Sequence, residues 1–315
     1  MTKPLIIRLC NWVGEAVLAL PGLLALEAEG YELHLVGKRW AVALFAAHGW
    51  HVYVRPAKRG EVIAQLKGLR MRLSAQDPTF ASRPNMVLLT NSFSSALEAR
   101  LAGLKPVGYA KDGRGFMLAK GVRPAPVAHE SDHYWRINSA LLTHSSRPSV
   151  QTTLRIQEAQ TQAARLALSK AGVSGPFVVL CPFSGAADTT GKKQWPVFPE
   201  LARVLRARGL SVVLCPGPGE EVDAERDYAG CHQLLGLDLG VYAALMCLAS
   251  FVVSNDTGPG HMAGAVGAKL LAVFGPGSIA AWAPIGPGVR LLHPKGRWAD
   301  IGEAMSLLNA EWLPA

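Results

Sequence analysis

Short apolar runs alternate with longer amphipathic segments along most of the chain. In the first half, the apolar runs predict five strands, at residues 5–9, 32–36, 51–54, 86–89 and 106–109. The segments between them have helical spacing, at residues 15–29, 39–47, 60–70 and 93–103. This alternation is typical of right-handed βαβ units that build a parallel sheet.

The same alternation starts again in the second half. Strands are predicted at 177–181, 211–215, 233–235, 251–254 and 270–274, and helices at 153–171, 198–208, 220–229, 240–249 and 261–267. A last helix is predicted within 297–312, and a polar, proline-bearing break at 145–149 separates the halves. The sequence therefore predicts an α/β protein with two Rossmann-like domains, at 1–150 and 151–315. The domains are expected to face each other across a cleft, with ligands at the carboxyl ends of the strands.

The composition fits a folded protein with large cores. Half of the 315 residues are hydrophobic and 17% are charged, which argues against disorder. No apolar run reaches the roughly 18–20 residues of a membrane-spanning helix, and the first residues have the pattern of a strand rather than of a signal peptide. We therefore expect a cytoplasmic protein. The five widely spaced cysteines are interpreted as reduced thiols packed like small hydrophobic residues.

The net charge of +9 is unevenly distributed. Residues 1–150 contain 19 Lys and Arg against 10 Asp and Glu, whereas residues 151–315 contain 13 of each class. An excess of positive charge attracts nucleic acid, an anionic membrane surface or a phosphorylated substrate. A solvated basic surface without any partner is the alternative, and composition alone does not reject it.

The strongest chemical signal lies around Asp256. A buried strand runs into Asn255, Asp256, Thr257 and Gly258, and a helix then begins. Asp256 or Thr257 can cap this helix, whose first N–H groups and positive dipole end suit a diphosphate. His261 falls in the first helical turn, within reach of a phosphate or sugar. An ordinary junction between a strand and a capped helix is the alternative.

Two further loops follow strands of the same predicted sheet. Ser184 and Gly185 form a small-residue loop that lets a phosphate approach the backbone. Lys193 precedes Gln-Trp-Pro, where a fixed lysine supplies a positive charge for a leaving diphosphate; a loop lysine that faces solvent is the alternative. Glu220 follows the strand at 211–215 and is a candidate ribose ligand or, equally, a helix-capping carboxylate.

Glu15 carries the third signal, at the first strand–helix turn of the chain. It follows Trp-Val-Gly directly after an apolar strand. A carboxylate at that turn faces the expected cleft, where it can act as general base on an incoming hydroxyl. A favourable acidic residue in the first turn of a helix is the alternative.

Together, these segments resemble the ADP-heptose:lipopolysaccharide heptosyltransferases of glycosyltransferase family 9. The family's W-x-G-D element corresponds to residues 12–15, its K-x-W-P element to 193–196, and its D-[TS]-G-x-x-H element to 256–261. The F-G-P element that follows corresponds to 274–276, and the likeness covers essentially the whole chain. Glu15 stands where the family has its aspartate, so the carboxylate is kept but moved by about one methylene. A misplacement near 1 Å can cost on the order of 100-fold in rate.

The resemblance implies a GT-B fold in which the first domain binds the acceptor and the second binds ADP-heptose. The implied donor contacts are Ser184, Gly185, Lys193, Glu220, Leu237, Asp256, Thr257, Gly258 and His261. The implied catalytic residues are Glu15 as general base, with Lys193 and Asp256 at the leaving diphosphate. No obligatory metal or other cofactor is expected, because no DxD-type acidic pair lies at a predicted strand end.

The implied acceptor is a phosphorylated, lipid-linked core oligosaccharide. Its negative charge would explain the excess of positive charge in the first domain. The candidate acceptor contacts are Arg55, Lys58, Arg59, Lys111, Arg114, Lys120 and Arg123. Such an acceptor also implies peripheral contact with the inner face of the inner membrane, and no nucleic acid. A Rossmann dehydrogenase is disfavoured, since neither domain begins with GxGxxG. A non-catalytic nucleotide-sugar-binding protein and a heptosyltransferase with a protein acceptor remain as alternatives.

Overall fold

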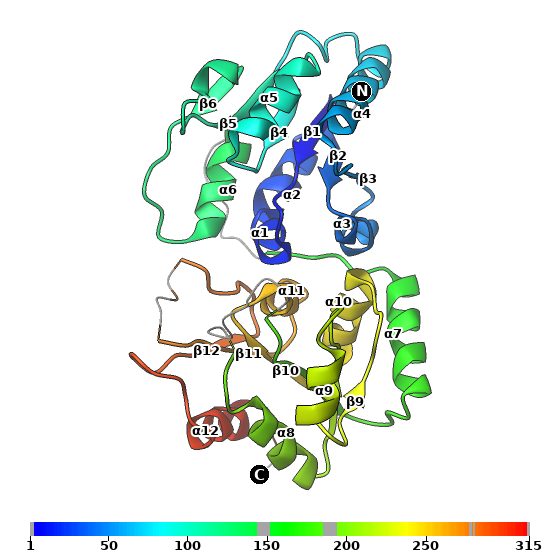
Figure 1. Cartoon of the computed structure of the whole chain (residues 1–315), viewed down its shortest axis with the longest axis vertical. Helices are drawn as coiled ribbons and strands as arrows, with labels where there is room; N and C mark the ends of the chain where they lie inside the picture. The colour runs from blue at the N-terminus through cyan, green and yellow to red at the C-terminus, as the bar shows by residue number, and fades with distance from the viewer. Residues whose placement is uncertain (1–2, 144–151, 185–193, 277–278, 280, 314–315) are drawn as a thin grey trace. The chain divides into compact units, whose positions relative to one another are not determined.

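The computed structural model describes residues 3–143, 152–184, 194–276, 279 and 281–313. The chain forms two compact units, Met1–Val150 and Gln151–Ala315, and each contains one six-stranded sheet (Figure 1). All the paired strands are parallel. The predicted α/β class with two Rossmann-like sheets is therefore confirmed. None of the described helices is long and apolar enough to cross a membrane.

The first sheet has the strand order β3-β2-β1-β4-β5-β6. Its strands are β1 (Lys3–Arg8), β2 (Tyr31–Gly37), β3 (His51–Val54), β4 (Met86–Leu88), β5 (Pro106–Tyr109) and β6 (Lys120–Val122). The helices of this unit are α1 (Val13–Leu18), α2 (Leu20–Ala28), α3 (Trp40–Leu44), α4 (Arg59–Gln76), α5 (Phe93–Leu101) and α6 (Glu130–Ser139). The strand order reverses between β1 and β4, which is where open α/β sheets bind ligands.

Helices cover the first sheet, because its strands carry apolar side chains on both faces. Buried residues of α4 and α5 pack against Ile6, Val36 and Leu88 on one face. Helices α1, α2 and α6 form a separate group, in which α2 packs closely on α6. Gly22 of α2 permits this contact, since a Cβ there would lie 2.5 Å from the side chain of Asn138.

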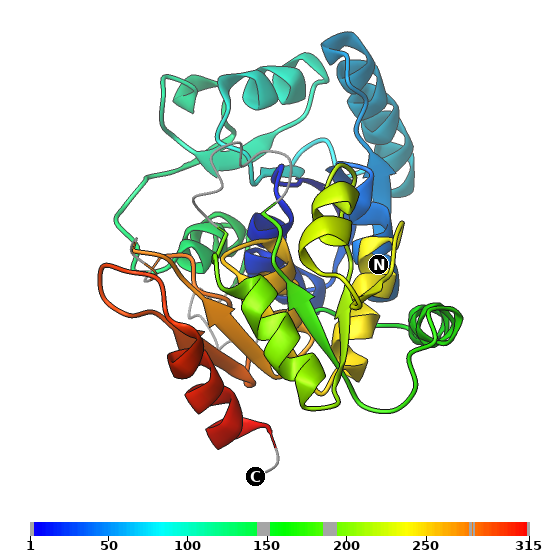
Figure 2. The same ribbon diagram turned by 60° about the horizontal axis from the view of Figure 1, so that its bottom comes forward.

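The second sheet repeats this topology, with the order β12-β11-β10-β7-β8-β9. Its strands are β7 (Phe177–Cys181), β8 (Ser211–Leu214), β9 (His232–Gln233), β10 (Phe251–Asn255), β11 (Leu270–Val273) and β12 (Val289–Leu292). The helices are α7 (Glu158–Lys170), α8 (Phe198–Ala207), α9 (Glu221–Asp227), α10 (Leu239–Leu248), α11 (Gly258–Ala265) and α12 (Ile301–Glu311). One core cluster joins α8 and α12 to the strands, and Figure 2 shows these two helices on the same face of the sheet.

Several helix bounds differ from the prediction. The helix predicted at 15–29 is divided at Ala19 into α1 and α2, because Pro21 has no N–H to continue the hydrogen bonding of α1. The helix predicted from residue 153 begins at Glu158, where Gln157 and Gln160 form a capping box. The hydrophobic pattern does not predict α6, β6 or β12.

Candidate functional site

A polar pocket of about 210 Å³ lies beyond the carboxyl ends of β1 and β4 in the first unit. It is lined by Cys10, Asn11, Trp12, Glu15, Leu89, Thr90, Asn91, Ser92 and Tyr134. These residues come from the loops that follow the two strands, from α1 and from α6. The pocket thus lies at the reversal of strand order, where the fold favours a ligand.

Glu15 is the ionisable carboxylate of this pocket and lies in the first turn of α1. Burial raises its pKa above the ordinary value, and the nearby charge of Glu130 acts in the same direction. Hydrogen bonds from the Tyr134 hydroxyl and from the main chain of Trp12 partly offset this effect. A carboxylate with a raised pKa is a stronger base than an exposed one.

Tyr134 lines the same pocket as Glu15 and Cys10. Its side chain comes from α6 and is 5% exposed. Burial raises the pKa of the Tyr134 hydroxyl and of the Cys10 thiol. Both groups are therefore neutral at pH 7, and the Tyr134 hydroxyl lowers the pKa of the Glu15 carboxyl, against the effect of burial. The hydrophobic pattern of the sequence does not reveal Tyr134, because it does not predict α6.

Arg114 is buried beside the pocket, with an exposed fraction of 0%. Its Nε donates to the Tyr109 carbonyl at 2.8 Å, and its Nη1 donates to the carbonyls of Thr90 and Ser92 at 2.8 and 3.2 Å. Its Nη2 donates to Asn91 Oδ1 at 3.3 Å. The guanidinium thus holds the loop that forms one wall of the pocket. Arg114, one of the candidate acceptor contacts, is thus buried and bound to the main chain of that loop.

The other candidate acceptor contacts fall into two groups. Arg55, Lys58, Arg59, Lys111 and Arg123 all follow the carboxyl ends of β3, β5 or β6, so they lie toward the edge that carries the pocket. Lys120 begins β6, and its amine donates to the Ala140 carbonyl, just after α6, at 2.6 Å. The structure therefore places Lys120 at the opposite edge of the sheet, where a cation stabilises the end of a helix.

Arg8 adds a buried positive charge at the carboxyl end of β1. It is 7% exposed, and its Nη2 lies 3.6 Å from Glu98 Oε2. Burial, together with the positive charge of Arg55, lowers the pKa of Arg8 to about 10, against the opposing effect of Glu98. Arg8 therefore stays charged at pH 7 and reinforces the positive potential near Arg55. A charged residue inside an apolar strand is the sequence signal that marks it.

In the second unit, Asn255 joins two of the predicted donor segments. This side chain at the end of β10 is fully buried. Its Nδ2 donates to the Pro182 carbonyl at 2.6 Å, and its Oδ1 accepts the Trp195 N–H at 2.9 Å. The indole of Trp195 is itself held by the Ala299 carbonyl at 2.8 Å. Asn255 thereby fixes the loop after β7 and the K-x-W-P segment next to the turn that starts at Asp256.

The turn at Asp256 leads into α11 as the sequence predicts, but Thr257 is its N-cap without a capping hydrogen bond from its side chain. Gly260 and His261 donate to the Thr257 carbonyl at 3.1 and 3.4 Å, and residue 259 is a proline without an N–H. The described turn therefore offers a diphosphate fewer main-chain donors than predicted, with Gly258 as the main one. Gly260 permits close packing on β10, since a Cβ there would lie 3.1 Å from Ser254 Oγ.

The remaining donor candidates lie at the carboxyl edge of the same sheet. Ser184 follows β7, and its hydroxyl accepts from Gln194 Nε2 at 3.1 Å. Glu220 follows β8, and its carboxylate accepts the Gly217 N–H at 2.7 Å. Leu237 is partly exposed in the loop before α10. Gly185 and Lys193 lie outside the described residues.

Residues 85–300 match the sequence model of glycosyltransferase family 9 (heptosyltransferase). This chain belongs to glycosyltransferase family 9. It is therefore a glycosyltransferase, and the matched span includes the K-x-W-P segment and the turn at Asp256. The family predicted from the sequence motifs is confirmed.

Solved structures of other family 9 and heptosyltransferase proteins share the fold of this glycosyltransferase. The ADP-heptose LPS heptosyltransferase II of E. coli aligns with a TM-score of 0.79 at 21% identity, over 98% of each chain. A family 9 glycosyltransferase of Veillonella parvula aligns with a TM-score of 0.77 at 17% identity, over 98% of this chain and 91% of that one. The E. coli heptosyltransferase WaaC, solved with ADP, aligns with a TM-score of 0.73 at 19% identity, over 98% and 99%. These likenesses confirm the GT-B fold class, and no curated protein sequence matches significantly.

Proposed function

We propose that this family 9 glycosyltransferase transfers a heptose from ADP-heptose to a hydroxyl of the lipopolysaccharide inner core, with inversion at the anomeric carbon. The observation that carries the chemical step is the partly buried Glu15 carboxylate, which shares a polar pocket with Tyr134. Glutamate takes the role that the family's aspartate has, and its raised pKa suits a base that works near neutral pH.

The reaction is a direct displacement. An acceptor hydroxyl in the Glu15 pocket attacks the anomeric carbon from the face opposite the diphosphate, and its proton passes to Glu15. The bond between the anomeric carbon and the diphosphate oxygen breaks, and ADP leaves with the electron pair. Glu15 would face the reacting hydroxyl, and Tyr134 would face Glu15. Each of these two residues is held by its own helix, which favours a fixed geometry.

The second unit is proposed to bind the donor. Its support is the group of loops at one sheet edge that Asn255 ties together, with Ser184, Glu220, Leu237, Asp256, Thr257, Gly258 and His261 around it. Lys193 and Gly185 are assigned to the diphosphate by their sequence motif. Positive charge on Lys193 and the Gly258 N–H would stabilise the charge that develops on leaving ADP. The donor choice draws support from E. coli WaaC, which was solved with ADP-2-deoxy-2-fluoro heptose.

The acceptor is proposed to be anionic and lipid-linked. Its support is the charge excess of the first unit and the placement of Arg8, Arg55, Lys58, Arg59, Lys111 and Arg123 toward the edge that carries the Glu15 pocket. Phosphates of a core oligosaccharide would bind these cations, and the lipid part would bring the protein to the inner face of the inner membrane.

The test is to incubate the purified protein with ADP-heptose and purified inner-core acceptor, and to follow the mass of the acceptor together with ADP release. One added heptose per acceptor is the expected result. ADP-heptose binding without a mass change in any core acceptor would instead support a non-catalytic nucleotide-sugar-binding protein. Transfer to a protein substrate alone would support the protein-acceptor alternative.

A further inference from the structure

A second cluster of polar side chains lies at the edge of the first sheet opposite the Glu15 pocket. Glu32 and His34 occupy alternate positions of β2 and therefore share one face. His51, the first residue of β3, is paired with His34 in the parallel register. Glu32 and His51 lie at the amino ends of β2 and β3, His34 lies at the middle of β2, and β3 is an edge strand. The proposed transfer reaction uses none of the three residues.

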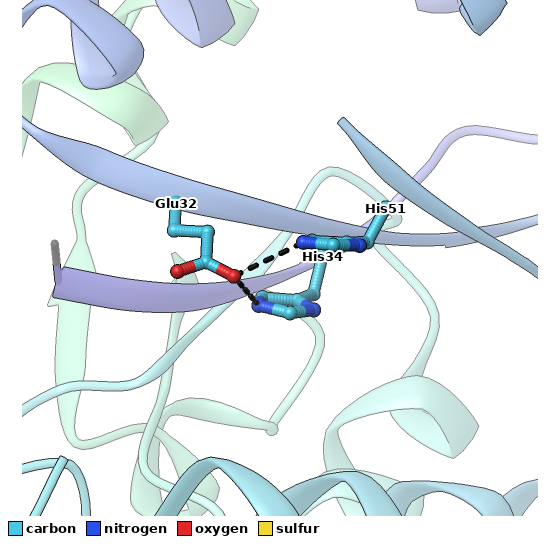
Figure 3. A group of neighbouring side chains, drawn as sticks. All are labelled: Glu32, His34 and His51. Atoms are coloured by element: carbon cyan, nitrogen blue, oxygen red, sulfur yellow. Dashed lines mark hydrogen bonds and ion pairs between the residues drawn. The ribbon is translucent and has the colours of Figure 1, made fainter. Parts of the chain in front are cut away.

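The three side chains converge on one point. Glu32 Oε1 lies 3.0 Å from His51 Nε2 and 3.2 Å from His34 Nε2, and Figure 3 shows a nitrogen of each ring turned toward the same carboxylate oxygen. One donor atom of each residue lies within 4.8 Å of the other two. In a tetrahedral zinc site with bonds of about 2.0–2.2 Å, neighbouring donor atoms are about 3.3 Å apart. The distances from Glu32 Oε1 to the two histidine nitrogens, 3.0 and 3.2 Å, are close to that value.

His34 supplies an independent sign that something else belongs at this point. Its side chain is buried, with an exposed fraction of 2%, and its Nε2 makes no hydrogen bond within the described structure. Glu32 Oε1 lies 3.2 Å from it as an ion-pair partner, and a buried polar atom whose hydrogen bonding is incomplete is costly. An ion bound to the Nε2 lone pair would satisfy this atom.

The surroundings of His34 favour the tautomer that such an ion requires. His34 Nδ1 lies 3.2 Å from the Tyr53 hydroxyl, to which Arg72 Nη2 also donates at 2.5 Å. When Nδ1–H donates to Tyr53, Nε2 carries the free lone pair, and metal-bound histidines commonly use their second nitrogen in this way.

We propose that Glu32, His34 and His51 bind a divalent ion of the zinc class, which ties the edge strand β3 to β2. Two imidazoles and one carboxylate suit Zn²⁺, Co²⁺ or Ni²⁺ better than Mg²⁺ or Ca²⁺, which prefer oxygen ligands alone. The His51 side chain is 52% exposed, so it gives the ion an entry path and leaves a fourth position for water. The two rings are stacked at 4.6 Å with an angle of 12°, and the exposed His51 ring is the one that turns toward the ion.

The test uses tag-free, full-length protein, stripped with a chelator and then titrated with Zn²⁺. The exposed Cys247 thiol is replaced in every sample by Cys247→Ser, so that it does not bind zinc. We expect one Zn²⁺ per chain by calorimetry, and two imidazole nitrogens with one carboxylate oxygen by X-ray absorption. Saturation should raise the melting temperature by about 5–10 °C.

The exposed His51→Ala variant keeps the core intact and should lose at least about 100-fold in zinc affinity together with the thermal shift. His293→Asn, a histidine of the second unit, is the matched control and should bind zinc like the parent. Equal zinc affinity in His51→Ala and the parent would overturn the proposal. So would absorption spectra without imidazole ligands.

Discussion

The Glu15 carboxylate has a property that suits a general base, because burial raises its pKa. Glu15→Gln keeps the size of the side chain but removes the proton acceptor. Turnover should fall by about 100- to 10,000-fold while donor affinity stays nearly unchanged. The measurement is steady-state transfer to the core acceptor, with donor binding by calorimetry.

The melting temperature of the same variant separates catalysis from a purely structural role. If Glu15 only favours the start of α1, both Glu15→Gln and Glu15→Asp should lose about 0.3–1 kcal/mol of stability and keep near-normal turnover. Glu15→Asp restores the family's residue, yet it should lose activity if the pocket has adapted to the longer side chain. Retention of more than about a tenth of the parent turnover in Glu15→Gln would rule out the general-base role.

Tyr134 is expected to act through Glu15, and the pH dependence of turnover tests this. Only ionised Glu15 accepts a proton, so turnover should fall as the pH drops through its raised pKa. The Tyr134 hydroxyl stabilises the ionised form, so Tyr134→Phe should raise the pKa of Glu15 further and shift the acid limb of the profile to higher pH. Tyr31→Phe removes a hydroxyl that bonds the distant Leu141 carbonyl and is the control. An unmoved acid limb in Tyr134→Phe would contradict this effect on Glu15.

Lys193 is assigned to the leaving diphosphate by its motif. Lys193→Ala should raise the donor dissociation constant or lower turnover by roughly 10- to 1000-fold, because one preorganised charge is worth about 1.4–4 kcal/mol. Lys192→Ala removes a neighbouring charge outside the motif position and should have a much smaller effect. Equal results for the two variants, measured by donor titration and ADP release, would refute the assignment.

At the scale of elements, the buried parallel strands were predictable because they are continuous apolar runs between polar turns. The predicted bounds of β3, β5 and β7 coincide with those in the structure. The pattern fails for β6, whose Lys-Gly-Val sequence is largely exposed. It also fails for α6, which begins with the polar residues Glu-Ser-Asp-His and is held in place by contacts with α2 that are distant in sequence.

The residues of the candidate site also divide into those that local sequence reveals and those that only tertiary structure reveals. Residues that belong to one loop after one strand, such as Glu15 and Asp256, are marked by local spacing. Arg114 and Tyr134 are not, because their environment is created by segments far away in the chain. The three carbonyls that Arg114 holds belong to Thr90, Ser92 and Tyr109, so its burial depends on tertiary structure. Sequence alone therefore finds a basic residue there but does not reveal that it is buried.

Asn255 connects elements in the second unit, and its removal should affect both stability and donor binding. Asn255→Ala leaves the buried Trp195 N–H and Pro182 carbonyl without partners, which should cost about 2–5 kcal/mol of stability. The donor dissociation constant should also rise, because the loop after β7 and the K-x-W-P segment lose their common anchor. Asn309→Ala, on the exposed face of α12, is the control. Thermal unfolding and donor titration provide the two measurements, and unchanged donor affinity in a folded Asn255→Ala protein would separate Asn255 from the donor site.

At the scale of the whole molecule, the two units differ in net charge. Both have the same strand order, but the excess of positive charge lies in the first. A common fold does not require this asymmetry, since exposed charges contribute little to stability. An anionic ligand of the first unit, as proposed for the acceptor, would account for the asymmetry, and the placement of the charges on the sheet gives a test.

The placement of the basic residues predicts that acceptor binding depends on where these residues lie on the first sheet, and not on the net charge of the protein. Lys58, Arg59 and Lys111 lie toward the edge that carries the pocket, whereas Lys3, Lys105 and Lys120 begin or precede strands at the opposite edge. Replacing the first three residues with glutamine should raise the acceptor KM by about 10- to 100-fold and flatten its dependence on salt. The same replacement of the second three removes equal charge and should change the KM little.

Donor affinity should stay the same in both triple variants, because neither changes the second unit. The ion pairs that the first set loses, Lys58 with Glu61 and Lys111 with Asp112, are exposed and longer than 3.7 Å, so the melting temperature should hardly move. Equal KM increases in the two variants would mean that the acceptor responds to the overall field of the protein. A fall in donor affinity in the first variant would mean that these cations serve the nucleotide sugar, and the assignment of the acceptor to the first unit would be wrong.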